Sequence, residues 1–199
     1  MSENVVRLII VAVGGQGNLL TAKVLGEACL ASGVEVRMSE IHGMAQRGGV
    51  VESAIIMGPA QSTVISDGQA DVLVGFEPAE TLRAIRRAHK DTLVITNTSP
   101  LPPFTAAIGK GVYPDLDNVL DLLRQKTAKV IAFDAMALAR EAENPLSLNM
   151  VLLGALVATD KVPVKAEAVR KAIADTTKKD FVARNQKAFD LGFEAARDA

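Results

Sequence analysis

Residues 5–17, with the sequence VVRLIIVAVGGQG, decide the fold expected of this chain. The aliphatic and β-branched run 5–13 is typical of a strand that is buried on both faces of a parallel sheet. Glycines end this strand, and residues 18–31 then have the apolar spacing of a helix that Gly33 should terminate. With an alternating strand over 34–38, these segments predict a β-α-β unit in the first 40 residues.

The next part of the sequence continues to alternate between apolar runs and helical patterns. Further strands are expected at 50–57, 62–65, 71–76, 93–97 and 129–133. One helix should begin near Pro78 and reach a basic end at 86–90, and another should contain Leu116, Val119, Leu120 and Leu123 at helical spacing. Between them, the proline-rich stretch 98–114 should be an irregular connection.

From Ala135 onward the pattern is helical. The last helix has an apolar face made by Phe181, Ala188, Phe189, Phe193 and Ala196. The sequence therefore predicts an α/β fold: a doubly wound, mostly parallel sheet with helices on both faces and a helical C-terminal segment. At this length we expect a single domain over residues 1–199.

Composition excludes several classes of function. The formal net charge is −1, and 4% of the residues are aromatic, so neither a nucleic-acid partner nor an anionic membrane surface is expected. A single cysteine, Cys29, allows no internal disulfide, iron–sulfur cluster or cysteine zinc site. No apolar stretch approaches the roughly 20 residues of a membrane span, and no signal peptide is evident. We therefore expect a cytoplasmic protein.

The loop Gly14, Gly15, Gln16 and Gly17 lies between the first strand and a helix N-terminus. Free backbone N–H groups and the helix dipole favour a phosphate or carboxylate at such a place. A dinucleotide fingerprint would have a third glycine where this chain has Leu20, so the loop supports NAD binding only weakly. An equally good interpretation is a tight turn that needs glycine for its backbone conformation alone.

A second glycine-containing loop should follow the second strand, at the same edge of the sheet as the first loop. Its candidate binding residues are Glu40, His42, Gly43, Met44, Gln46, Arg47, Gly48 and Gly49. Here Arg47 could pair with a carboxylate or phosphate, and His42 could exchange a proton near neutral pH. The density of polar types between glycines favours a functional surface over a plain loop.

The alternative for this loop is a structural role, with Arg47 paired to Glu40 or Glu52. Neither loop forms a catalytic set, because the sequence offers no nucleophile with a base, no carboxylate pair and no metal-ligand spacing. We therefore predict no catalytic and no metal-binding residue in this chain. His89, at a basic helix end, should be solvated, and Cys29 should belong to the core.

These motifs resemble the gamma subunits of 2-oxoacid:ferredoxin oxidoreductases, and within that family the small (beta) subunits of the indolepyruvate enzymes. The resemblance rests on VGGQG at 13–17, SEIHGMAQRGG at 39–49, DVLVGFEPAE at 71–80, NMVLLGAL at 149–156 and NQKAFDLG at 185–192. It therefore covers nearly the whole chain, and the string HGMAQRGG is its most specific part.

The resemblance implies a large alpha subunit as partner, which would hold thiamine diphosphate and iron–sulfur clusters, while this chain holds no cofactor by itself. The complex would decarboxylate an aryl pyruvate, pass electrons to ferredoxin and transfer the acyl group to coenzyme A. In that setting, residues 40–49 would face the large subunit near the substrate or coenzyme A, with Arg47 neutralising an anionic group. The isolated chain should be inactive.

Two other hypotheses remain open from the sequence. The chain could be a stand-alone small-molecule or nucleotide-binding α/β protein that uses the same sheet edge. It could also be a purely structural assembly subunit, whose loops make protein contacts alone. The first predicts tight ligand binding without a partner, and the second predicts loop variants that change assembly but never turnover.

Overall fold

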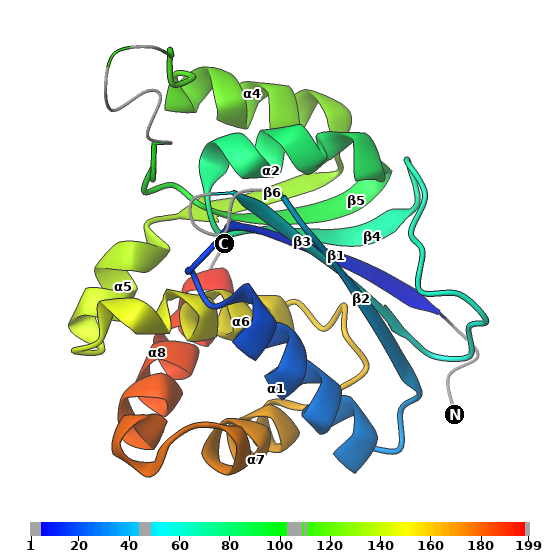
Figure 1. Cartoon of the computed structure of the whole chain (residues 1–199), viewed down its shortest axis with the longest axis vertical. Coiled ribbons are helices and arrows are strands. Elements are labelled where there is room, and N and C mark those ends of the chain that lie inside the picture. Colours follow the sequence, from blue (N-terminus) through cyan, green and yellow to red (C-terminus); the bar gives the residue numbers. More distant parts are fainter. Residues whose placement is uncertain (1–4, 44–48, 103–108, 110, 198–199) are drawn as a thin grey trace.

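The computed structural model describes residues 5–43, 49–102, 109 and 111–197. Its centre is a six-stranded sheet in the order β2-β3-β1-β4-β5-β6 (Figure 1). The strands are β1 (Val6–Val13), β2 (Val36–His42), β3 (Val50–Met57), β4 (Ala70–Gly75), β5 (Ala88–Asn97) and β6 (Lys129–Phe133). β3 is antiparallel to both of its neighbours, and the remaining pairs are parallel, so the expected mostly parallel sheet is confirmed.

Helices cover both faces of this sheet. They are α1 (Asn18–Ala31), α2 (Pro78–Ala84), α4 (Leu116–Lys126), α5 (Ala135–Glu141), α6 (Leu148–Ala158), α7 (Ala166–Thr176) and α8 (Lys179–Arg197). In Figure 1, α2 and α4 lie on one face, and α1 and α5–α8 lie on the other. The expected doubly wound fold with a helical C-terminal segment is therefore confirmed.

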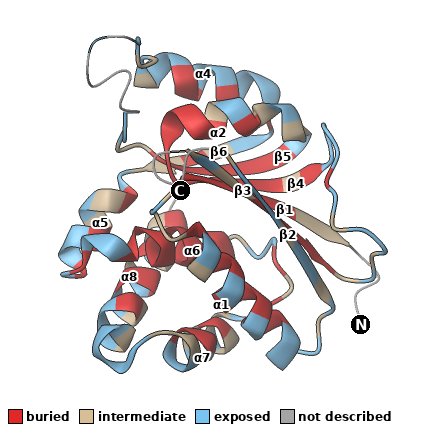
Figure 2. Cartoon of the chain, in the orientation of Figure 1, coloured by how far each residue is buried: buried red, intermediate tan, exposed pale blue. Residues whose placement is uncertain are grey.

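The central strand β1 is buried on both faces, as its apolar run predicts (Figure 2). Leu8, Ile10 and Ala12 belong to the hydrophobic core under α1 and the C-terminal helices. Ile9 and Val11 belong to a second core under α2 and α4. Residues 8–12 of β1 therefore pack alternately against one helical layer and the other, according to the two-residue period of a strand.

The first β-α-β unit is present, but its two strands are not neighbours. β2 runs in the same direction as β1, and β3 is inserted between them. Their carboxyl ends therefore lie at one edge of the sheet, on either side of the start of β3. Gly33 follows the end of α1 with a φ of 70°, as predicted for a helix terminator.

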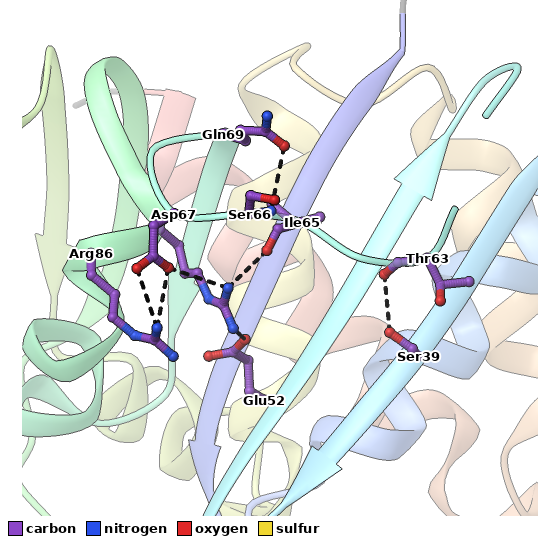
Figure 3. Close-up of polar contacts among 9 residues, drawn as sticks. Ser39, Glu52, Thr63, Ile65, Ser66, Asp67, Gln69 and Arg86 are labelled. Carbon is purple, nitrogen blue, oxygen red and sulfur yellow. Dashed lines mark hydrogen bonds and ion pairs between the residues drawn. The ribbon is translucent and has the colours of Figure 1, made fainter. Parts of the chain in front are cut away.

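The expected strand at 62–65 is wrong. This segment crosses the face of β2 and β3 as an irregular connection, and side chains bind its backbone (Figure 3). The Ser39 hydroxyl donates to the Thr63 carbonyl at 3.1 Å, and Arg87 donates to the Ile65 carbonyl at 2.8 Å. With two of its carbonyls bonded in this way and Ile65 buried in the core, the segment is held to the sheet without a strand partner.

Arg87 also anchors this connection to the sheet. Its guanidinium pairs with Glu52 of β3 at 2.8 Å and with Asp67 at 3.3 Å, and Asp67 accepts a further bond from Arg86 (Figure 3). The Arg87 and Glu52 side chains are 13% and 15% exposed. Removing Arg87 would leave the largely buried Glu52 carboxylate without this cation, so the pair ties the connection to β3.

The predicted basic helix end at 86–90 is also wrong. After α2 the chain makes a short 3-10 turn, η1 (Ile85–Arg87), and then enters β5 at Ala88, where a register shift separates Ala88 from the regular pairs. His89 consequently lies in a strand. Its Nδ1 accepts a hydrogen bond from the Asp91 N–H at 3.1 Å, and its side chain is half-buried rather than fully solvated.

Candidate functional site

The two predicted loops meet at the carboxyl edge of the sheet. The Gly14 N–H donates to the Gly49 carbonyl at 2.8 Å, and the Gly43 N–H donates to the Val50 carbonyl at 2.8 Å. Backbone hydrogen bonds therefore join the end of β1, the end of β2 and the start of β3. The sequence-based expectation that both loops share one edge is confirmed for these residues.

Gln16 bridges the gap between β1 and β4. Its Oε1 accepts from the Val13 N–H at 2.8 Å, and its Nε2 donates to the Phe76 carbonyl at 3.3 Å. The connections after these two strands go to opposite faces of the sheet, and a crevice at such a pair is the usual nucleotide site of doubly wound folds. A side chain spanning this gap disfavours a nucleotide there.

Gly15 and Gly17 have φ angles of 104° and 85°, in the region that favours glycine. A Cβ on Gly17 would also lie 2.8 Å from Nδ2 of Asn149, whereas a Cβ on Gly15 would meet nothing within 4 Å. Asn149, at the start of α6, donates to the Gly17 carbonyl at 3.2 Å. The loop is therefore fixed by Gln16 on one side and Asn149 on the other.

The N-terminus of α1 opens beside this loop. Its N-cap, Gly17, has no side chain to accept from the first N–H groups, and its first turn contains no acidic residue. These N–H groups and the helix dipole provide a partial positive charge. The Asn18 side chain donates to the Val51 carbonyl at 3.3 Å, and among the described residues its Oδ1 has no partner.

A cleft of about 720 Å³ lies at this edge, which we call the glycine-loop cleft. It is lined by Val13, Gly14, Gly15, Gly17, Asn18, Leu19, His42, Gly43, Val50 and Val51. Backbone N–H groups, a titratable ring and apolar side chains thus face one space that is large enough for a small organic ligand.

Glu40 and His42 form a pair at the end of β2. Their Oε2 and Nε2 atoms are 3.3 Å apart, and the Ser53 hydroxyl donates to the other oxygen of Glu40 at 3.5 Å. His42 lines the glycine-loop cleft, whereas Glu40 lines the groove between α1 and β2. The carboxylate therefore orients the imidazole from outside the cleft.

A second polar cluster lies at the end of β4. Glu77 is buried and accepts hydrogen bonds from the N–H groups of Glu80 and Leu101 and from the Tyr113 hydroxyl. Burial and the bond to Glu77 raise the pKa of Tyr113 above its usual value, and burial raises the pKa of Glu80. Glu77 therefore holds Leu101 and Tyr113 beside the N-terminus of α2.

Cys29 is buried in the core, as predicted, and burial raises the pKa of its thiol to about 11. Among the residues that the structure describes, no group of three or more His, Cys, Asp or Glu side chains could hold a metal ion. Within the same residues, no helix is long and apolar enough to cross a membrane.

Comparison with known proteins gives the family. Residues 7–195 match the pyruvate ferredoxin/flavodoxin oxidoreductase family. The chain belongs to this family. Indolepyruvate oxidoreductase subunit IorB of Pyrococcus horikoshii is 41% identical over 193 residues, which cover 96% of both chains. Its counterpart in Methanothermobacter thermautotrophicus is 39% identical over 192 residues, covering 96% of this chain and 98% of the relative.

Solved structures agree with this assignment. The gamma subunit of a keto/oxoacid ferredoxin oxidoreductase from Geobacter sulfurreducens superposes with a TM-score of 0.71 at 25% identity, covering 98% and 99% of the two chains. A 2-oxoglutarate:ferredoxin oxidoreductase chain from Magnetococcus marinus gives a TM-score of 0.74 at 18% identity. The superposition covers 100% of this chain and 32% of the Magnetococcus marinus chain, so the same fold also occurs there within a longer polypeptide.

These comparisons confirm the resemblance predicted from the sequence, and they support the oxidoreductase subunit over a stand-alone binding protein. For this family member, the structure brings Gly14, Gly15, Gly17, His42 and Gly43 to one cleft. Gln16 and Glu40 support its wall from outside. Four of the predicted residues lie outside the described part of the chain: Met44, Gln46, Arg47 and Gly48.

Arg47 lies outside the described residues, so the structural alternative for the second loop, in which Arg47 pairs with Glu40 or Glu52, stays a prediction. Among the described residues, Glu52 pairs with Arg87, and Glu40 pairs with His42. Sequence reasoning missed the role of Asn149, which supports Gly17 although the two residues are 132 positions apart in the sequence. A signal was present, because Asn149 is a polar residue at the start of an otherwise apolar helix.

Proposed function

We propose that this chain is the small subunit of a 2-oxoacid:ferredoxin oxidoreductase, with indolepyruvate or another aryl pyruvate as the substrate of the complex. The observation that carries this proposal is the similarity to two relatives named indolepyruvate oxidoreductase subunits along almost the whole chain. In the proposed complex, a large subunit holds thiamine diphosphate and iron–sulfur clusters. That subunit decarboxylates the 2-oxo acid, ferredoxin accepts the electrons, and coenzyme A accepts the acyl group.

The proposed contribution of this chain is a surface at the carboxyl edge of its sheet. The glycine-loop cleft presents the N-terminus of α1, which has no side-chain cap at Gly17, next to His42, and the N–H groups of such a terminus favour an anionic ligand. The Magnetococcus marinus enzyme was solved with 2-oxoglutarate, coenzyme A and succinyl-CoA bound. A coenzyme A or 2-oxo acid path along this cleft, with residues 40–49 facing the large subunit, is consistent with these features.

Further parts of the proposal come from the sequence. Arg47 lies outside the described residues and is proposed to neutralise an anionic group of the ligand or of the partner. The whole chain, 1–199, is proposed to act as a single gamma-type domain in the cytoplasm, without catalytic residues of its own.

The test is anaerobic co-expression with the candidate large subunit, followed by viologen reduction with aryl pyruvates and coenzyme A. We expect activity that requires both chains. A large subunit that never binds this chain, or that turns over equally well alone, would overturn the proposal. Tight ligand binding by the isolated chain would then indicate the stand-alone function.

Arg47→Ala separates the proposed role of the second loop from a purely structural one. In assembled complex, we expect the variant to raise KM for coenzyme A or the 2-oxo acid by about tenfold or more, as for loss of a charged contact. Unchanged assembly together with unchanged turnover would contradict a role for Arg47. A change in assembly without a change in turnover would indicate that the chain is a purely structural assembly subunit.

A further inference from the structure

A second, smaller hollow lies on the other side of the glycine loop. It has a volume of about 280 Å³ and shares Gly15 with the glycine-loop cleft. Its other walls come from the segment after β5, the end of α5, the 3-10 turn η2 (Pro145–Ser147) and the start of α6. We call this hollow the Arg140 socket. None of the motifs on which the family resemblance rests includes Arg140.

The walls of the socket are held in place by side-chain amides. Asn97, at the end of β5, donates to the Phe76 carbonyl at 3.1 Å and to the Ser99 carbonyl at 2.9 Å. Its Oδ1 accepts from the N–H groups of Ser99 and Ala135, both at 3.1 Å. One buried amide therefore joins β4, β5 and the start of α5, so the socket is preformed and does not depend on a ligand.

The mouth of the socket is apolar and exposed. Leu146 is 76% exposed and Leu101 is 47% exposed, while Leu148 is buried at the start of α6 and Met136 is half-buried on α5. Single exposed leucines are common on protein surfaces, but these two flank one preformed hollow. This arrangement suits a side chain of another protein, whose apolar part would enter between them.

Arg140 supplies the charge of the socket. It lies in the last turn of α5 and is the single charged side chain among the residues lining the hollow. Within the described part of the chain, the ion pairs involve other cations, and Arg140 has no carboxylate partner. A guanidinium at an apolar mouth is complementary to a carboxylate on whatever covers it.

We propose that the Arg140 socket is a docking site for the large subunit of the complex, which inserts an apolar side chain next to an acidic residue. This inference rests on the proposed function, since it presupposes that subunit. It extends the partner-facing surface across Gly15 to a region outside both glycine loops. A protein segment is favoured over a small ligand because the hollow is small and two of its leucines, Leu101 and Leu146, lie at the exposed rim.

The experiment measures the affinity of purified small-subunit variants for the large subunit, with enzyme turnover as a second readout. Arg140→Glu tests the charge, and Leu146→Ser tests the apolar rim. The matched controls are on α4, on the opposite face of the sheet (Figure 1). Lys126→Glu reverses a charge that is also in a last helical turn, and Leu122→Ser changes a leucine that is 49% exposed.

We expect Arg140→Glu and Leu146→Ser each to weaken assembly by about tenfold or more, as for residues at the centre of an interface, and the two controls to change it less than about twofold. The thermal unfolding midpoint of each isolated socket variant should match that of its control on α4. Wild-type assembly with unchanged affinity in both socket variants would overturn the inference and leave the proposed function intact. Failure of the wild-type chain to assemble would instead overturn the proposed function.

Discussion

In the loop after β1, Gly15 and Gly17 have positive φ angles, whereas Gly154 and Gly192 lie within the regular helices α6 and α8. The helical pair is needed for close packing. A Cβ on Gly154 would overlap the Phe189 carbonyl, and a Cβ on Gly192 would overlap the Val151 carbonyl. The first pair therefore sets a backbone conformation, and the second allows two helix backbones to touch. Glycine is therefore required at these two places for two different physical reasons.

The largest effect is expected at the helix contact. Gly154→Ala gains about 1 kcal/mol of helix propensity but must push α8 away from α6, which should cost about 3 kcal/mol or more overall. Chemical denaturation of the isolated chain measures this loss. Gly26→Ala in α1 is the matched control, because its Cβ would meet the flexible end of Met38 at 3.0 Å. The comparison fails if the two variants are equally stable.

Gly17→Ala should have the next largest effect. The alanine would have an unfavourable φ of 85° and would press on Asn149, and together these should cost about 2–3 kcal/mol. Urea unfolding measures the stability change. A variant as stable as the wild type would show that the loop adopts another conformation at little cost.

A double-mutant cycle separates the two causes at Gly17. In an Asn149→Ala background the side chain that presses on position 17 is gone, so Gly17→Ala should be less costly by about 1 kcal/mol. Equal costs in both backgrounds would mean that the φ angle alone requires glycine there. The measurement is the free energy of unfolding of the four proteins in the cycle.

Gly15→Ala should have the smallest stability effect of the series. Its φ of 104° is strained for alanine, but the space for a Cβ is open, so we expect a loss of about 1 kcal/mol. Gly15 lines both the glycine-loop cleft and the Arg140 socket. Expressed as free energies, the change that Gly15→Ala causes in assembly or in KM should therefore exceed the change in the free energy of unfolding. A larger stability loss than for Gly17→Ala would contradict the distinction drawn between these two glycines.

The sequence predicted most of the fold because local patterns set most of its elements. The apolar run of β1 and the periodicity of α4 and α8 are each consistent with the structure. The errors at 62–65 and 86–90 have a common cause. Both segments are short and lie where Arg87, Glu52 and Asp67 decide the backbone path, and such contacts cannot be read from local periodicity.

The candidate site was predicted only in part, because local patterns show its loops but not the distant residues that support them. Glycines and polar residues after two strands pointed to one sheet edge, and that edge follows from the parallel direction of β1 and β2. The supports of the edge come from distant positions, as Asn149 does for Gly17 and Asn97 does for Ala135. No local pattern joins such residues, since a side-chain amide can reach any backbone group that packing brings near it.

By itself the sequence determined the alternation of strands and helices, the two-sided burial of β1 and the family. These depend on the period of apolar residues and on strings such as HGMAQRGG, which are properties of the chain order. Tertiary structure decided that β3 lies between β1 and β2, that Gln16 spans the gap to β4, and that Arg140 stands beside a second hollow. These features depend on which segments pack together, and that balance of burial and hydrogen bonding is set by the whole fold.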